Sequence, residues 1–158
     1  MSALIRRAEA ADVPAMLDLA EQQRAQYARH HPRFWNPAPD ARQAQARYFA
    51  QLFEAPEVLT AVCMQETQLI GFLIARLVPA PPVYQPGGLT CLTDDFCAIS
   101  PDRWNIVGRQ LLEHTYAEAR QRGATQAVVV CGHLDQPKRD MLFSTGATLA
   151  SEWFVQEL

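Results

Sequence analysis

The chain has little of what marks a membrane, secreted or nucleic-acid-binding protein. No apolar stretch approaches the roughly 20 residues of a membrane helix, since Leu69–Val78 is interrupted by Arg76 and stopped by Pro79. The N-terminal residues lack the apolar core of a signal peptide. Lys and Arg are scattered along the chain, and the formal net charge is −3. We therefore expect a cytoplasmic protein that has neither a membrane nor a nucleic acid as its partner.

Cysteine and glycine are sparse as well, and neither forms a familiar motif. The cysteines lie in apolar stretches without C-x-x-C spacing, which predicts buried free thiols rather than disulfides. They are Cys63, Cys91, Cys97 and Cys131. The seven glycines form no G-x-x-x-x-G-K-[ST] and no G-x-G-x-x-G. His30 and His31 have no third ligand nearby in the sequence, so we expect no metal.

What the sequence does have suits a single domain spanning residues 1–158. With 49% hydrophobic and 20% charged residues, a chain of 158 residues can bury one core but is too short for two ordinary domains. Strands are predicted at 4–8, 58–64, 69–78, 89–99, 126–131 and 147–156, and helices at 12–27, 40–54, 103–122 and 137–145.

The order of these elements predicts an α/β fold of the α+β type. The second and third strands read as an antiparallel hairpin, whereas the strand, helix and strand from 89 to 131 predict two parallel strands. The sheet is therefore expected to be mixed and mostly antiparallel. We expect the apolar run Val128-Val129-Val130 to be buried within it.

The segment from Asp94 to Leu112 carries the strongest chemical signal. A strand runs into a short turn and then a helix that begins near Arg103, with Asn105 and Gly108 in its first turns. Backbone N–H groups at such a helix start bind anions, phosphate above all. By itself, this pattern also describes an ordinary connection between two parallel strands.

This segment resembles the acetyl-CoA-binding motif of the GNAT superfamily of N-acetyltransferases, R/Q-x-x-G-x-G/A at a helix start. Arg103-Trp104-Asn105-Ile106-Val107-Gly108 fills the motif, with Ile106 where the family has its first glycine. The order of elements over nearly all of the chain matches too. The resemblance implies a sheet of about six or seven strands flanked by about four helices, with acetyl-CoA as co-substrate.

The resemblance assigns cofactor binding to two groups of residues. The backbone of Phe96, Cys97 and Ala98 would pair with the pantetheine arm as an added strand. N–H groups at the helix start would hold the pyrophosphate. The two arginines of this helix start would either add positive charge to the site or be solvated side chains at the helix end. This second group is Arg103, Asn105, Ile106, Val107, Gly108 and Arg109.

The adjacent carboxylates of Asp94 and Asp95 are the candidate catalytic bases. An amine of pKa about 10.4 needs about 4 to 5 kcal/mol to lose its proton at pH 7, whereas a thiol of pKa about 8.5 needs about 2. A base therefore matters more than an acid. Because strand side chains alternate, we expect the two carboxylates on opposite faces of the sheet. In the family, the carboxylate that faces the acceptor usually lies on the same face of the strand as the valine of the motif. Ala98 takes the place of that valine here, and this favours Asp94. The alternatives are a turn-like break in the strand and a structural Asp buried against an arginine such as Arg76.

The tyrosine that usually serves the family as general acid has no counterpart here. Leu142 stands at its position with Phe143 beside it, so water or Ser144 would have to replace it. Asp135 stands where the family often has asparagine. For His133 we expect one of three roles: a catalytic base, a contact to CoA, or a loop residue that faces solvent.

Two loops, 27–39 and 79–88, are expected to determine which acceptor amine binds. Side chains such as Trp35 and Tyr84 would line a pocket for an acidic or aromatic small amine, or pack helices onto the sheet. The expected function is acetyl transfer from acetyl-CoA to the amine of a small molecule or peptide. The alternatives are a non-catalytic CoA-binding module, and a structural or partner-binding domain that forms a homodimer through the Trp153 strand.

Overall fold

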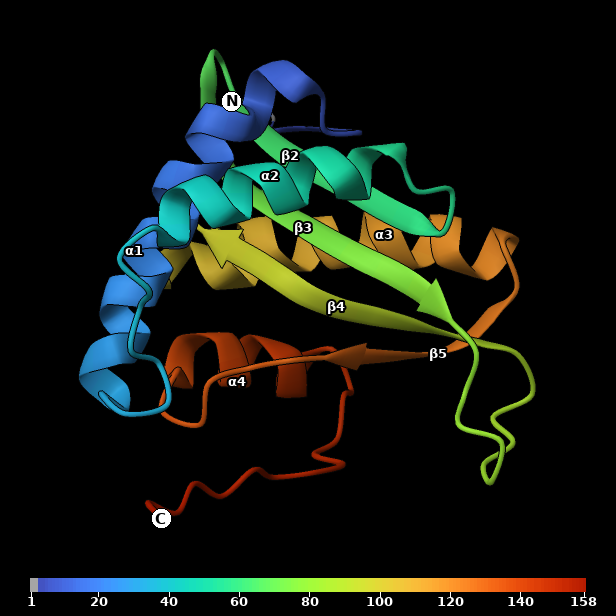
Figure 1. Ribbon diagram of the computed structural model, residues 1–158. Coiled ribbons are helices and arrows are strands. Elements are labelled where there is room, and N and C mark those ends of the chain that lie inside the picture. The colour runs from blue at the N-terminus through green and yellow to red at the C-terminus, as the bar shows by residue number, and fades with distance from the viewer. Residues whose placement is uncertain (1–2) are drawn as a thin grey trace.

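The computed structural model describes residues 3–158, in which four α-helices surround a five-stranded sheet (Figure 1). The strands, in spatial order, are β1 (Leu4–Arg6), β2 (Val58–Gln65), β3 (Gln68–Val78), β4 (Leu89–Ala98) and β5 (Ala124–Val129). The helices are α1 (Val13–His30), α2 (Ala41–Glu54), α3 (Arg109–Gln121) and α4 (Gln136–Ser144). β1 to β4 pair antiparallel and β4 pairs parallel with β5, which confirms the mixed, mostly antiparallel sheet.

The sheet within residues 3–158 has five strands, fewer than the six or seven expected. The strand expected at 147–156 does not form, and Trp153 is 82% exposed. β5 is therefore an edge strand, and Val128 is 42% exposed. The prediction that this apolar run is buried is wrong, because an apolar run indicates a strand but does not tell whether a neighbour covers it.

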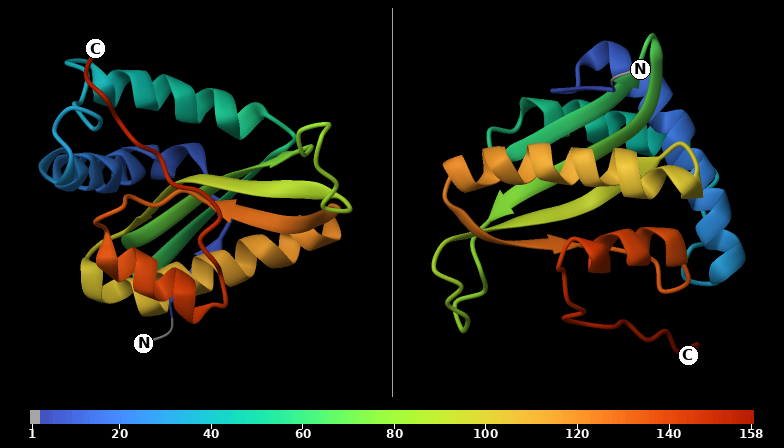
Figure 2. Two further views of the ribbon diagram at one scale, coloured as in Figure 1. Left: turned by 90° about the horizontal axis from the view of Figure 1, so that it is seen from below. Right: turned by 180° about the vertical axis from the view of Figure 1, so that it is seen from behind.

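Helices cover both faces of the sheet. α1 and α2 lie on one face, and α3 and α4 lie on the other (Figures 1 and 2). The first face buries Phe49 of α2 against Phe72 of β3, with ring centroids 5.9 Å apart. The second face buries Phe96, Trp104 and Leu111. Each layer thus has its own apolar core, and the sheet separates the two.

All four predicted helices form, but α1 extends to His30 rather than to residue 27, and α3 begins at Arg109 rather than at residue 103. Pro14 lies in the first turn of α1, and Gly123 and Gly146 follow α3 and α4 in the left-handed region, with φ of 93° and 89°. Asp12 does not cap α1 with its side chain. Its carboxylate instead pairs with Arg6 at 2.7 Å, and this hydrogen bond holds the pKa of Asp12 below its usual value.

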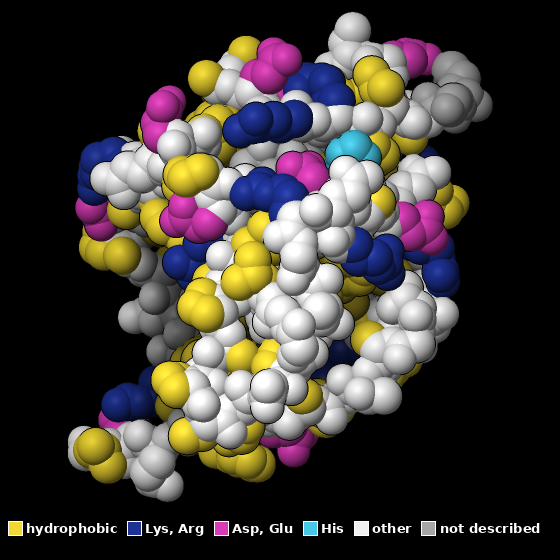
Figure 3. All heavy atoms as spheres, turned by 90° about the vertical axis from the view of Figure 1, so that its right-hand side faces the viewer, with side chains coloured by type: hydrophobic (Ala, Val, Ile, Leu, Met, Phe, Trp, Pro, Cys, Tyr) yellow, Lys and Arg dark blue, Asp and Glu magenta, His cyan; other side chains and the backbone are white. Residues whose placement is uncertain are grey.

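The thiols and the charges are distributed much as the sequence indicates. Cys63, Cys91 and Cys97 are buried and free, as predicted, whereas Cys131 is partly exposed. Acidic and basic side chains are interspersed on the face that Figure 3 shows. Within residues 3–158, no helix combines the length and the apolar character that crossing a bilayer requires.

Candidate active site

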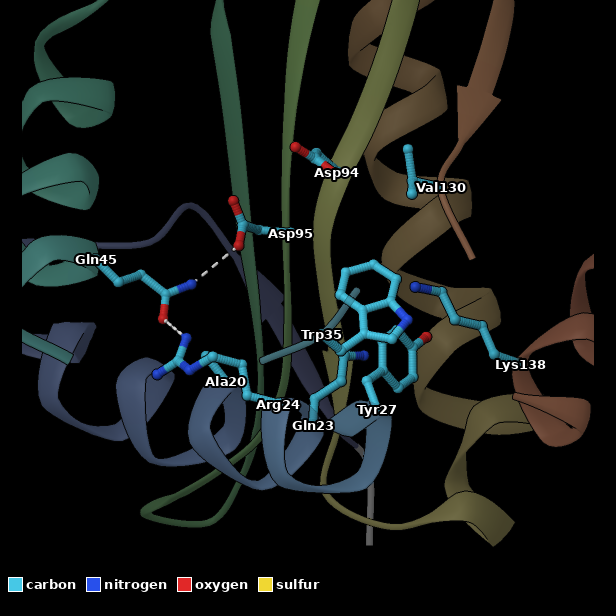
Figure 4. A pocket seen from close by; sticks show the side chains of 10 residues that line it. All are labelled: Ala20, Gln23, Arg24, Tyr27, Trp35, Gln45, Asp94, Asp95, Val130 and Lys138. Carbon is cyan, nitrogen blue, oxygen red and sulfur yellow. Dashed lines mark hydrogen bonds between the residues drawn. The ribbon is translucent and has the colours of Figure 1, made fainter. Parts of the chain in front are cut away.

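A bulge in β4 brings Asp94 and Asp95 to one cavity. Ile74 of β3 lies opposite Asp95, but the next residue, Ala75, lies opposite Thr93, so Asp94 is an extra residue in β4. Both aspartates line a cavity of about 160 Å³ that α1, α2, β4 and α4 border (Figure 4). The expectation that they face opposite sides of the sheet is wrong, because the bulge interrupts the alternation.

A polar chain from α1 and α2 holds Asp95. Gln45 Nε2 donates to Asp95 Oδ1 at 3.1 Å, and Arg24 Nη1 donates to Gln45 Oε1 (Figure 4). Burial first, and then the charge of Asp94, raise the pKa of Asp95 to about 6. The Gln45 hydrogen bond and the charges of Lys138 and Arg24 act in the opposite direction. A carboxyl group with a pKa close to neutrality is suited to general base catalysis.

Tyr27 and Trp35 form an aromatic wall of the cavity, with ring centroids 5.0 Å apart. Tyr27 Oη donates to Asp135 Oδ2 at 2.7 Å and accepts from the Gly132 N–H at 3.2 Å. Burial and the Asp135 carboxylate raise the pKa of Tyr27. The hydroxyl thus ties α1 to the start of α4, and Asp135 is committed to this contact and to capping α4.

The two loops expected to choose the acceptor lie at different ends of the sheet. Loop 27–39 borders the cavity through Tyr27 and Trp35. Loop 79–88 lies at the far end of β3 and β4 (Figure 1), and its Tyr84 is 71% exposed and does not line the cavity. The structure therefore supports a substrate-facing position for the first loop only.

Lys138, to which no sequence motif assigns a role, reaches the cavity from α4. It is only 2% exposed, its Nζ donates to the Phe96 carbonyl at 3.3 Å, and it lies over the rings of Phe96 and Trp104. No ion pair within 4.0 Å among residues 3–158 includes it. Lys138 is the one lysine among 14 Lys and Arg residues. The rarity of lysine is the feature of the sequence that could have drawn attention to Lys138.

β4 and β5 separate beside this lysine. Their pairing ends where the Val130 N–H donates to the Thr93 carbonyl at 3.0 Å, and β4 continues through 94–98 without β5. On this edge the Phe96 carbonyl accepts from Gln23 Nε2 at 3.0 Å and from the lysine. Side chains thus satisfy a backbone acceptor that a neighbouring strand would otherwise take.

The helix start that follows β4 is irregular. A 3₁₀ turn at Pro101–Arg103 leads into a π-helical turn at Trp104–Gly108, and α3 follows. Its outward side chains are Arg103, Asn105, Ile106 and Arg109, whereas Trp104, Val107 and Gly108 are buried. Only backbone groups of the buried residues can therefore meet a ligand at the surface of this turn.

Gly108 makes room for an aromatic side chain of its own turn. A Cβ at Gly108 would lie 2.7 Å from Trp104 Cε3 and 3.2 Å from Met141 Cε. The Trp104 ring in turn packs edge-on against Phe96 at 4.8 Å. Close packing between the helix start, α4 and β4 therefore requires a glycine at position 108.

The remaining candidates lie outside the cavity. His133 is exposed, and Ser144 Oγ donates to the Met141 carbonyl and accepts from Arg109 Nη2 at 2.7 Å. Leu142 packs against the core beneath α3 and carries no hydroxyl. The structure thus brings Asp94, Asp95 and the open β4 edge together and leaves His133 and Ser144 apart from them.

The sheet, the separation of β4 from β5 and the helix that starts after β4 give this chain a GNAT-like fold, as the resemblance implied. A tetramutant of a protein from Bacillus halodurans matches with a TM-score of 0.84 and 15% identity, over 98% of this chain and 99% of that one. A predicted acetyltransferase with acetyl-CoA from Clostridium acetobutylicum matches with a TM-score of 0.75 and 17% identity, over 99% and 96%.

An aminoglycoside N-acetyltransferase in complex with CoA has the same fold as this chain. Its TM-score is 0.73 at 13% identity, over 99% of this chain and 95% of that one. No family model and no curated protein matches the sequence. At these identities the likeness establishes the fold, and the chemistry has to be argued from the site.

Proposed function

We propose that this chain is a single-domain, acetyl-CoA-dependent N-acetyltransferase that acts on the amine of a small molecule or peptide. The observation that carries the proposal is the pair of carboxylates, Asp94 and Asp95, in one cavity beside the open edge of β4. Similar structures with acetyl-CoA or CoA support the choice of co-substrate.

Two features of the chain would hold acetyl-CoA. The backbone of Phe96, Cys97 and Ala98 would pair with the pantetheine arm, and the Phe96 carbonyl already accepts from side chains alone on that edge. The turn from Arg103 to Arg109 would hold the pyrophosphate with its N–H groups and the two terminal arginines. These donors and acceptors fit an anionic, amide-containing molecule.

Asp95, and not the Asp94 that the strand alternation favoured, is the proposed general base, because Asp95 is the less exposed of the two and burial raises its pKa. Acetyl-CoA supplies an acyl thioester whose carbonyl carbon bonds to the amine nitrogen as the carbon–sulfur bond breaks and CoA leaves as its thiolate. Asp95 would take the proton that the amine loses, and its pKa of about 6 leaves it mostly ionised at pH 7. Asp94 is more exposed and would attract the cationic amine into the cavity.

Thermal stabilisation and thiol release test this proposal. Acetyl-CoA at 100 times its Kd should stabilise the fold by about 2.7 kcal/mol, whereas NAD and ATP should not. Asp95→Asn should keep this stabilisation and lower kcat by about 100-fold or more, and Glu152→Gln on the exposed C-terminal segment should change neither. Absence of stabilisation at millimolar acetyl-CoA would contradict the proposal.

CoA binding without chemistry is the second candidate function. It is favoured by Leu142, which stands at the position of the family's tyrosine and offers no hydroxyl. Stabilisation by acetyl-CoA without thiol release across a panel of amines would select this candidate.

A further inference from the structure

Opposite charges line the cavity on two sides. Asp94 and Asp95 extend from β4, and the Lys138 ammonium points into the cavity from α4 (Figure 4). Tyr27 and Trp35 provide apolar surface between them. The lining therefore carries the two carboxylates with Arg24 at one side and the Lys138 cation at another.

Lys138 has more hydrogen-bonding capacity than the protein uses. An ammonium group has three N–H donors, and Lys138 Nζ makes one hydrogen bond, of 3.3 Å, with two aromatic rings beside it. The residue is 2% exposed and has no carboxylate within 4.0 Å among residues 3–158. Because a buried charge is costly unless it is paired, an anion at this point would be stabilised.

The other cationic group on the cavity wall is partly engaged. Arg24 Nη1 donates to Gln45, which links it to Asp95, whereas Arg24 Nη2 is buried without a hydrogen-bond partner in the described part of the chain. If a pantetheine arm takes the Phe96 carbonyl, as in the proposed function, Lys138 also loses its one hydrogen-bond acceptor. The substrate would then have to supply an anionic partner.

We infer that the acceptor carries a carboxylate together with its amine. The carboxylate pairs with Lys138, and the amine lies toward Asp94 and Asp95. A cavity of about 160 Å³ has room for roughly five water-sized groups, which suits a small amino acid whose methylene groups pack on Tyr27 and Trp35. The identification of the amine as the acetylated group rests on the proposed function, whereas the binding mode does not.

Calorimetry without any acyl-CoA tests the binding mode. The probes are glycine, β-alanine and 4-aminobutanoate, each with its amide and with the acid that lacks the amine. At least one amino acid should bind 10-fold or more tightly than its amide and than the amine-free acid. Lys138→Met, which keeps an unbranched side chain but removes the ammonium group, should abolish the preference for acid over amide. Arg139→Met, which removes the neighbouring cation on α4, should retain it.

The outcomes separate this inference from the proposed function. Equal affinity for acid and amide in the unaltered protein, equal affinity for the amine-free acid, or no binding of any probe overturns the inference, whatever the variants do. Acetylation of uncharged amines in preference to amino acids also overturns it and leaves the transferase standing. Selective binding of an amino acid by a protein that acetyl-CoA does not stabilise upholds the site and removes the transferase.

Discussion

Replacing Asp95 by Asn should stabilise the protein, and more so at alkaline than at acidic pH. The carboxyl group of Asp95 has a pKa of about 6 in the folded protein against 3.8 as its ordinary value, chiefly because it is buried. Asn keeps an Oδ1 that can accept the hydrogen bond from Gln45 but cannot ionise. The substitution therefore removes the cost of a buried charge and leaves the local contacts in place.

The sign and size of the effect follow from proton linkage. A carboxyl group whose pKa is raised by folding binds its proton more tightly in the folded state, so its contribution to stability is lost as pH rises from about 4 through 6. A difference of about 2 in pKa corresponds to about 3 kcal/mol over the whole range. Between pH 5 and pH 8, the same two pKa values give a loss of about 1 to 1.5 kcal/mol.

Urea denaturation at pH 5 and pH 8 measures this difference. The free energy of unfolding of Asp95→Asn minus that of the unaltered protein should grow by about 1 to 1.5 kcal/mol between the two pH values. Glu152→Gln makes the same change in net charge on an exposed segment and should show no such growth. A difference that stays constant or shrinks as pH rises would show that Asp95 is not a buried, destabilised carboxylate.

Two further substitutions test the packing around the site. Gly108→Ala should destabilise the fold by about 1 to 3 kcal/mol in urea, because the added Cβ would lie 2.7 Å from Trp104 Cε3. Tyr27→Phe should cost about 1 to 3 kcal/mol, because it removes the 2.7 Å hydrogen bond to the buried Asp135. Tyr48→Phe on the more exposed surface of α2 should change stability by less than about 0.5 kcal/mol.

The local pattern of apolar and polar residues was sufficient to predict most of the fold. The hairpin of β2 and β3 closes through Glu66 and Thr67, where the apolar runs are interrupted by polar residues. The parallel pairing of β4 with β5 follows from the helix between them, because such crossovers place both strands in one sheet. These features depend on residues close in sequence, and periodicity reports them directly.

The site depends on contacts that periodicity does not report. The bulge at Asp94 is defined by the register of β4 against β3, and neither strand's own sequence pattern marks it. Lys138 meets the Phe96 carbonyl across 42 positions of the chain. The exposure of β5 likewise depends on whether residues 147–158 pair with it, which their alternating pattern alone does not determine.

The distance between the charges of Asp95 and Lys138 explains how the carboxylate of Asp95 can remain a useful base. Lys138 lowers the pKa of Asp95, but its effect is smaller than that of burial. A direct ion pair would depress the pKa of the carboxylate strongly and weaken it as a proton acceptor. Because Lys138 lies on α4 and turns toward Phe96, it stays more than 4.0 Å from Asp95. The same separation leaves both charges available to a substrate that carries an amine and a carboxylate.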